Sequence, residues 1–109
     1  MIYELRIYRC VPKRLPALLK RFETTTLDMF KKHGMRQAGF WTVEVGQHMS
    51  TDLYYMLAWE SMAEREQKWN AFQADPEWIE KRAKSEEDGA IIAELHNSFL
   101  KPTAFSAVK

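Results

Sequence analysis

The sequence contains little cysteine and little glycine. Cys10 is the single cysteine in 109 residues, and the four glycines are scattered singly along the chain. One cysteine excludes an internal disulfide framework and a cysteine-based structural zinc site. Isolated glycines do not make the glycine-rich loop that binds phosphate groups. The histidines His33, His48 and His96 fall on different elements at no ligand-like spacing, so we expect no bound metal.

Neither sign of charge dominates. The 16 Lys and Arg residues balance 15 Asp and Glu residues, which gives a formal net charge of +1. This balance gives no electrostatic reason to expect nucleic acid or a membrane surface as a partner. No apolar run approaches the roughly 18 residues of a membrane-spanning helix. Glu4 and Arg6 stand where a signal peptide would carry its apolar stretch, so we expect a cytoplasmic protein.

Large apolar side chains are abundant by contrast. Hydrophobic residues make up 46% of the chain, and the aromatic residues comprise 4 Trp, 4 Tyr and 6 Phe. These side chains are sufficient for a folded core, and the composition is too apolar for a disordered chain. Because 109 residues is the length of one ordinary domain, we predict a single domain over residues 1–109.

Hydrophobic periodicity indicates the order of the elements. Alternation with a period of two predicts four β-strands, over residues 2–10, 37–46, 53–60 and 90–99. Apolar residues at steps of three or four predict a long amphipathic helix over residues 13–33. Ser61 and Glu64 are spaced as a capping box that starts a second helix. The Asp75–Pro76 pair restarts that helix as a short third one.

The resulting order, β-α-β-β-α-β, is typical of the ferredoxin-like fold. We predict an α+β protomer with one four-stranded antiparallel sheet and helices on one of its faces. The other face is expected to carry a mixture of polar and apolar residues: Ile2, Glu4, Arg6, Tyr8, Phe40, Thr42, Glu44, Tyr54, Met56, Ala58, Glu94, His96 and Ser98. Such a face is too apolar for solvent and too charged for a dry core. We therefore expect a homodimer whose two sheets face each other.

Short motifs spread along the chain carry a family resemblance. They are Met1–Tyr8, Lys32–Gly34, Gly39–Trp41, Trp59–Arg65, Asp75–Trp78 and Leu100–Ser106. Together, and in this order, they resemble the NIPSNAP family of the dimeric α+β barrel superfamily. The family's common form has Tyr where this chain has Phe40, which removes a hydroxyl group.

The resemblance implies a ferredoxin-like protomer and a dimeric α+β barrel. It does not name a reaction. The superfamily includes cofactor-free monooxygenases, haem proteins, small-molecule isomerases and members without known catalysis. Fold analogy alone is therefore a weak guide to the chemistry of this chain.

A first candidate site is the polar set expected on the barrel face. It comprises Glu4, Arg6, Tyr8, Glu44 and His96. Carboxylates close to a histidine can shift each other's pKa values and perform acid–base catalysis. The alternative is an interfacial salt-bridge network that fixes the register of the dimer.

A second candidate site is the space between the sheet and the helices. His33 ends the apolar stripe of the first helix, and the aromatic walls expected around it are Trp41, Tyr55, Trp59, Trp69, Phe72 and Trp78. Aromatic walls with a few polar groups are typical of a small-molecule pocket. There His33 is suited to act as a base or as a haem ligand, although no second ligand or attachment motif supports haem. The alternative is a filled core in which His33 contacts helix C-terminal carbonyls.

We predict a homodimeric protein that binds a small apolar or aromatic molecule, without a cofactor. If it is an enzyme, we expect a metal-free one of monooxygenase or isomerase type, with His33 or His96 as the acid–base group and Arg6 as an anion anchor. The expected ligand contacts are Glu4, Tyr8, Trp41, Tyr55, Trp59 and Trp69. The alternative is a non-catalytic interaction or scaffold module that acts through its dimer surface. An open cavity reaching His33 favours the enzyme, and a filled interior favours the scaffold.

Overall fold

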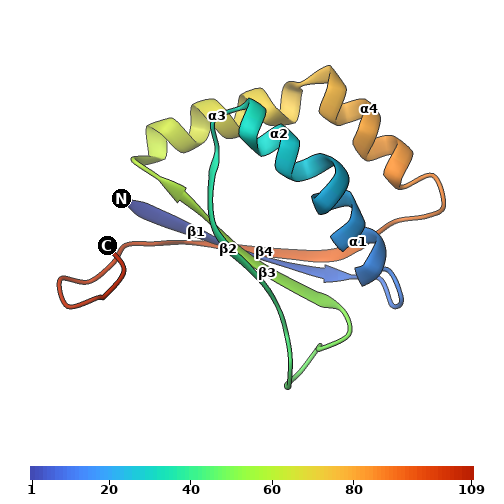
Figure 1. The fold of residues 1–109 in the computed structure, drawn as a ribbon, viewed down its shortest axis with the longest axis horizontal. Helices are drawn as coiled ribbons and strands as arrows, with labels where there is room; N and C mark the ends of the chain where they lie inside the picture. The colour runs from blue at the N-terminus through green and yellow to red at the C-terminus, as the bar shows by residue number, and fades with distance from the viewer.

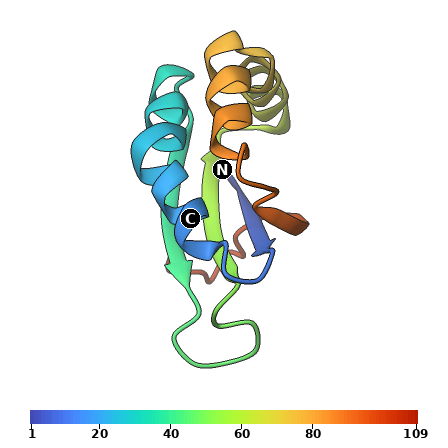
Figure 2. The same ribbon diagram turned by 90° about the vertical axis from the view of Figure 1, so that its right-hand side faces the viewer.

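A single antiparallel sheet forms one layer of the molecule, and the helices form the other (Figure 1). The computed structural model describes residues 1–109. Its strands are β1 (Ile2–Cys10), β2 (Arg36–Thr42), β3 (Asp52–Trp59) and β4 (Ile92–Leu100). They lie in the order β2-β3-β1-β4, and every neighbouring pair is antiparallel. All the helices cover the same face of the sheet, as the turned view in Figure 2 shows. The predicted α+β, ferredoxin-like protomer is confirmed.

The first helical segment contains a widened turn. It consists of α1 (Leu15–Arg21), a π-helical turn η1 (Phe22–Thr26) and α2 (Leu27–Lys32), where the sequence predicted one regular helix. The Thr24 hydroxyl donates to the Lys20 carbonyl at 2.8 Å, so a side chain takes up one backbone acceptor beside the π turn. Such π turns are frequent near functional sites.

Side-chain caps begin the remaining two helices. Helix α3 (Met62–Ala74) starts where the Glu64 amide donates to the Ser61 hydroxyl at 3.1 Å. The Glu64 carboxylate accepts from the Glu60 amide, one residue before the amide that the capping box predicted. Helix α4 (Pro76–Ser85) starts where the Glu77 amide donates to the Asp75 carboxylate at 2.9 Å. Both predicted N-caps are confirmed. None of the helices is both long and apolar enough to cross a membrane.

The predicted assignment of faces is wrong for β1 and β2. Glu4 and Arg6, with 0% and 4% of their surface exposed, lie on the helix side of the sheet. In β2, Phe40 stacks on the buried Tyr55 ring at 4.9 Å, so it also lies under the helices, whereas Trp41 is 52% exposed. Period-two alternation separates two sets of side chains but does not say which set the helices cover. In β3 the predicted faces are correct, since Tyr55 is buried beneath the helices.

Because the faces of β1 are reversed relative to the prediction, apolar side chains of β1 lie on the sheet face that the helices do not cover. We call this the open face. Leu5 pairs with Met56 and Ile7 pairs with Tyr54 across β1 and β3, and these side chains point away from the helices. With one face uncovered, the radius of gyration is 14.6 Å, against about 13 Å for a compact domain of this length. The predicted mixed face is therefore more apolar than expected, because Glu4, Arg6 and Tyr8 are not on it. Its charged residues gather at one end, where Arg9 pairs with Asp52 and Glu94.

The core between sheet and helices is built from aromatic contacts. Phe22 meets Tyr55 edge-on at 5.2 Å, and Phe30 meets Phe72 edge-on at 5.4 Å. The centre of the Phe72 ring in turn lies 4.8 Å from the centre of the Trp78 ring. Edge-to-face arrangements of this kind add to the stabilisation from buried area. The chain of rings runs from β3 through η1 and α2 to α3 and α4.

The N-cap of α3 gives a test of the fold. We expect Ser61→Ala to lower the free energy of unfolding by about 0.5–2 kcal/mol, because the Glu64 amide loses its acceptor. Urea denaturation followed by circular dichroism measures the change. Ser61→Asp keeps an acceptor at the same place and is expected to retain most of the stability. An unchanged midpoint for Ser61→Ala would show that the helix does not depend on this cap.

Candidate functional site

Glu4 is a buried carboxylate with five hydrogen-bond donors. Arg65 donates twice, at 3.0 and 3.1 Å, and Arg6 donates at 2.8 Å. The Asn97 amide donates at 3.1 Å and the Trp59 indole at 3.2 Å. Burial alone would raise the pKa of Glu4, but the hydrogen bonds from Arg65, Asn97 and Arg6 outweigh it and hold that pKa below its usual value. The Glu4 carboxylate is therefore ionised, its acceptor positions are occupied, and its hydrogen bonds join β1 to β3, β4 and α3.

Arg6 connects this carboxylate to two tyrosines. Its Nε donates to the Tyr55 hydroxyl at 2.8 Å, and Nη2 donates to the Tyr8 hydroxyl at 3.0 Å. The guanidinium lies 4.2 Å from the centre of the Trp69 ring, within cation–π distance. Burial would lower the pKa of Arg6, but Tyr55, Tyr8 and Glu4 together raise it. Arg6 therefore stays charged at all physiological pH values.

The hydroxyl proton of Tyr8 is not donated to any protein acceptor. Burial raises the pKa of Tyr55 well above its usual value, so this phenol is neutral. Tyr55 donates to the Tyr8 hydroxyl at 2.8 Å, and Tyr8 also accepts from Arg6. Because Tyr8 accepts both bonds, its own O–H has no acceptor within the protein.

A cavity of about 430 Å³ lies beside this network. It is enclosed by residues from β1, α1, α3, α4 and β4: Arg6, Tyr8, Arg21, Trp69, Gln73, Trp78, Arg82, Glu86, Ile92 and Leu95. We call this space the helix-side cavity. A void of about 20 Å³ shares five of these lining residues and is also lined by Phe22, Phe30 and Phe72. The polar cavity thus has an aromatic inner end.

Two buried donors in the cavity lining have no acceptor. Arg21 and Trp78 are 6% and 5% exposed, and neither Arg21 Nε nor Trp78 Nε1 has a hydrogen-bond partner. The other end of the Arg21 guanidinium lies 3.4 Å from the Ser85 hydroxyl and 3.6 Å from the Glu86 carboxylate. Burial lowers the pKa of Arg21, and Glu86 offsets part of that effect. Buried polar groups are nearly always satisfied in proteins, so these two donors mark the site.

The structure brings together most of the predicted site residues but separates the histidines from them. Glu4, Arg6, Tyr8, Tyr55, Trp59 and Trp69 form one connected network on the helix side. The two predicted sites are therefore largely one site. Trp41 lies on the open face, and Glu44 is exposed beyond the end of β2.

His33 and His96 do not line the helix-side cavity. His33 lies 2.7 Å from the Asp75 carboxylate, which also accepts from Lys32 at 2.8 Å. The hydrogen bonds from Lys32 and His33 hold the pKa of Asp75 far below its usual value. This contact ties the end of α2 to the start of α4. His96 is exposed on β4 and lies 3.2 Å from Glu94. The cavity is open, but it does not reach His33.

Sequence reasoning missed the basic residues contributed by the helices. Arg21 follows Leu18 by three residues and precedes Phe22, and both of these neighbours are buried. That spacing places Arg21 on the buried face of the helix. A charged residue is not counted in a pattern of apolar residues, so the spacing alone did not reveal it. Nothing local in the sequence indicates that Arg65 or Asn97 would reach Glu4, because these contacts join distant parts of the chain.

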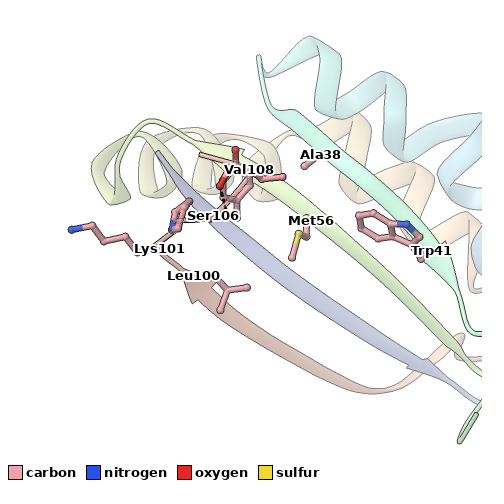
Figure 3. Close-up of a pocket in the computed structure, with 9 residues that line it drawn as sticks. Ala38, Trp41, Met56, Leu100, Lys101, Ser106 and Val108 are labelled. Atoms are coloured by element: carbon pink, nitrogen blue, oxygen red, sulfur yellow. Dashed lines mark hydrogen bonds between the residues drawn. The ribbon is translucent and has the colours of Figure 1, made fainter. Parts of the chain in front are cut away.

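A second cavity, of about 360 Å³, lies on the open face. Side chains from the sheet, such as Trp41 and Met56, and from the segment after β4, such as Ser106 and Val108, line it (Figure 3). Its lining is mostly apolar: Tyr3, Ala38, Trp41, Met56, Leu100, Lys101, Pro102, Ser106 and Val108. The Tyr3 hydroxyl donates to the Lys109 carbonyl at 3.0 Å, which holds the end of the chain against the sheet. This space lacks the buried charges of the helix-side cavity.

Comparisons with known proteins agree with this fold. The family described as NIPSNAP matches residues 3–107 of the chain. A NIPSNAP family protein of unknown function from Agrobacterium tumefaciens is 28% identical, over 100% of this chain and 94% of that one, with a TM-score of 0.86. An uncharacterised NIPSNAP domain protein from Burkholderia xenovorans is 24% identical, over 97% and 98%, with a TM-score of 0.82.

A more distant structure shares the fold alone. It is described as a dimeric ferredoxin-like protein from an uncultured marine organism, and it is 12% identical over 94% of both chains, with a TM-score of 0.59. No curated protein matches the chain.

The Glu4 network gives a stability test. We expect Glu4→Gln to lower the free energy of unfolding by about 3–5 kcal/mol, because the buried Arg6 and the partly buried Arg65 lose their counter-charge. Denaturant titration at pH 7 measures the loss. The matched control is Glu94→Gln on the exposed part of β4, which should change stability by less than about 0.5 kcal/mol. Equal effects of the two changes would contradict the role given to Glu4.

The same network predicts an acid dependence. The folded-state pKa of Glu4 lies below its usual 4.5, so the unfolded chain binds the proton more readily. The contribution of the Glu4 carboxylate to the free energy of unfolding is complete above pH 4.5 and is lost as the pH falls through the folded-state pKa. We expect the stability of Glu4→Gln to fall less steeply with acid than that of the wild type. If the free energies of unfolding of the two proteins fall equally steeply with acid, then the fold does not lower the pKa of Glu4.

Proposed function

The chain belongs to the NIPSNAP family, and from this premise we propose that it is a homodimeric protein that binds a small aromatic or apolar molecule in each protomer. The ligand would occupy the helix-side cavity, and the open sheet faces of two copies would pack together.

The size and lining of the helix-side cavity carry the ligand-binding part of this proposal. Protein interiors pack about as densely as organic crystals, and voids larger than a water molecule are few. A space of about 430 Å³ between sheet and helices falls in the range of small-molecule sites, roughly 300–1,000 Å³. Its walls combine Trp69 and Trp78 with the polar groups of Arg6 and Tyr8. A few fixed polar groups among aromatic walls are what such sites use to orient a ligand.

The lining favours binding over proton abstraction. Glu4 accepts five hydrogen bonds, so it is not free to act as a base. Glu86 is the one carboxylate in the lining, and it lies 3.6 Å from Arg21. Tyr8, Arg21 and Trp78 present N–H or O–H groups instead. We therefore propose binding and assign no acid–base reaction to His33 or His96.

The apolar open face supports the homodimer. Leu5, Ile7, Tyr54, Met56 and Trp41 form a contiguous surface along paired strands. A large apolar surface of this kind is rarely left in water, and two sheets packed face to face bury it in an aligned sandwich or barrel. The interface would carry fewer charges than the sequence predicted, because Glu4 and Arg6 lie on the other side of the sheet. Arg9 stays on the open face, where it pairs with Asp52 and Glu94.

Association through the open face predicts a clear change of mass. We expect the wild type to sediment as a dimer of two 12.9 kDa chains and Met56→Glu to sediment as a monomer, because a charge is introduced into the centre of the apolar face. Analytical ultracentrifugation at micromolar concentration measures both. Ile79→Glu is the matched control, since Ile79 is exposed on α4. A monomeric wild type, or a dimeric Met56→Glu, would contradict the proposed interface.

Ligand binding predicts a calorimetric signal that depends on the cavity. We expect 1-naphthoate, 1-naphthalenemethanol or both to bind at one site per protomer by isothermal titration calorimetry. Gln73→Trp should reduce the affinity at least tenfold, because a larger side chain would fill the space that Gln73 borders. Gln67→Trp on the exposed side of α3 is the control. If neither compound binds the wild type, or if Gln73→Trp binds equally well, the proposed site is wrong.

A further inference from the structure

Arg21 and Trp78, the two residues with unpartnered donors, are neighbouring side chains. The Arg21 guanidinium carbon lies 5.8 Å from the centre of the Trp78 ring, and both residues line the helix-side cavity. They hold the only buried side-chain nitrogen or oxygen atoms in the protein without a partner. A buried donor without an acceptor is costly, so a lining that keeps two of them is suited to a ligand that supplies acceptors.

The charges around the helix-side cavity favour a negative ligand. Arg6, Arg21 and Arg82 line it, and Arg65 adjoins it through Glu4. Four guanidiniums thus stand against the carboxylates of Glu4 and Glu86, which leaves two positive charges uncompensated. Arg82 has no ion-pair partner and is exposed where the cavity opens.

The surface next to the cavity also carries a net positive charge. A neighbouring depression of about 500 Å³ between α1 and α4 shares Arg21 with the helix-side cavity. Five basic residues and two acidic ones line it: Arg14, Lys20, Arg21, Lys81 and Lys84, with Glu87 and Asp88. A concave surface of one dominant charge raises the local concentration of ligands of the opposite charge.

The rest of the lining is suited to a ring. Trp69 and Trp78 flank the cavity, Ile92 and Leu95 close its β4 side, and the inner void leads to Phe22 and its neighbouring rings. These surfaces offer apolar contact to a flat body, while the free donors stand on one wall.

We propose that the helix-side cavity binds an aromatic carboxylate, whose carboxylate oxygens accept hydrogen bonds from Arg21 Nε–H and Trp78 Nε1–H while its ring lies against Trp69. This inference rests on the proposed ligand-binding function and names the chemical class of the ligand. The Tyr8 hydroxyl, whose proton has no acceptor in the protein, is placed to donate to a further ligand oxygen. Two donors on neighbouring side chains match the two oxygens of a carboxylate.

A comparison of two compounds of similar shape tests the ligand class. In isothermal titration calorimetry, 1-naphthoate should bind the wild type at least about tenfold more tightly than 1-naphthalenemethanol, since hydrogen bonds to an ionised acceptor are the stronger ones. Equal affinities would overturn the carboxylate inference and leave the proposed binding function standing. Binding of neither compound would overturn the proposed function and this inference with it.

Two variants test the assigned donors. Trp78→Phe removes the indole N–H and keeps a ring, and it should weaken 1-naphthoate several-fold while leaving 1-naphthalenemethanol nearly unchanged. Arg21→Met should abolish the preference for the carboxylate. Arg36→Met, which removes an exposed arginine of β2, is the matched control and should keep the full preference. Circular dichroism checks folding, and Trp78→Phe alone decides the matter if Arg21→Met does not fold. A full preference in Trp78→Phe would overturn the assignment.

Discussion

The ion pairs of the buried Glu4 with Arg6 and Arg65 determine how the sheet and the helices fit together. The Glu4 carboxylate accepts from both arginines, from Asn97 on β4 and from Trp59 on β3. A buried carboxylate is tolerated only with such complete compensation. The donors come from the helix layer as well as from the sheet, so the network fixes which face of β1 lies under the helices.

Two consequences follow from that choice of face. Glu4 and Arg6 of β1 lie beneath α3, so Leu5 and Ile7 lie on the open face, and their apolar side chains suit it for a second copy. The same choice places Arg6 and Tyr8 beside the helix-side cavity, where hydrogen bonds and the Trp69 ring fix their positions. Polar groups that are already held in place lose little freedom when a ligand binds.

The elements and caps of the fold could be predicted from the sequence because their signals are local. Ser61 and Asp75 mark helix starts through bonds to amides two or three residues away. The facing of β1 could not be predicted in the same way, because Arg65 and Asn97 lie 61 and 93 residues from Glu4. Charged residues on alternate positions suggested a solvent or interface side. The candidate site was predicted as two separate groups, one around Arg6 and one around Tyr55, which the structure joins in one network. Arg21 was not predicted, because its charge concealed its place on the buried face of the helix.

A crystal structure with 1-naphthoate would show which cavity takes the ligand, because the protein has two cavities of similar size on opposite faces of the sheet. We expect the compound in the helix-side cavity, with its carboxylate about 2.7–3.1 Å from Arg21 Nε and Trp78 Nε1. A compound bound only on the open face, beside Trp41 and Met56, would show that the helix-side cavity is not the binding site.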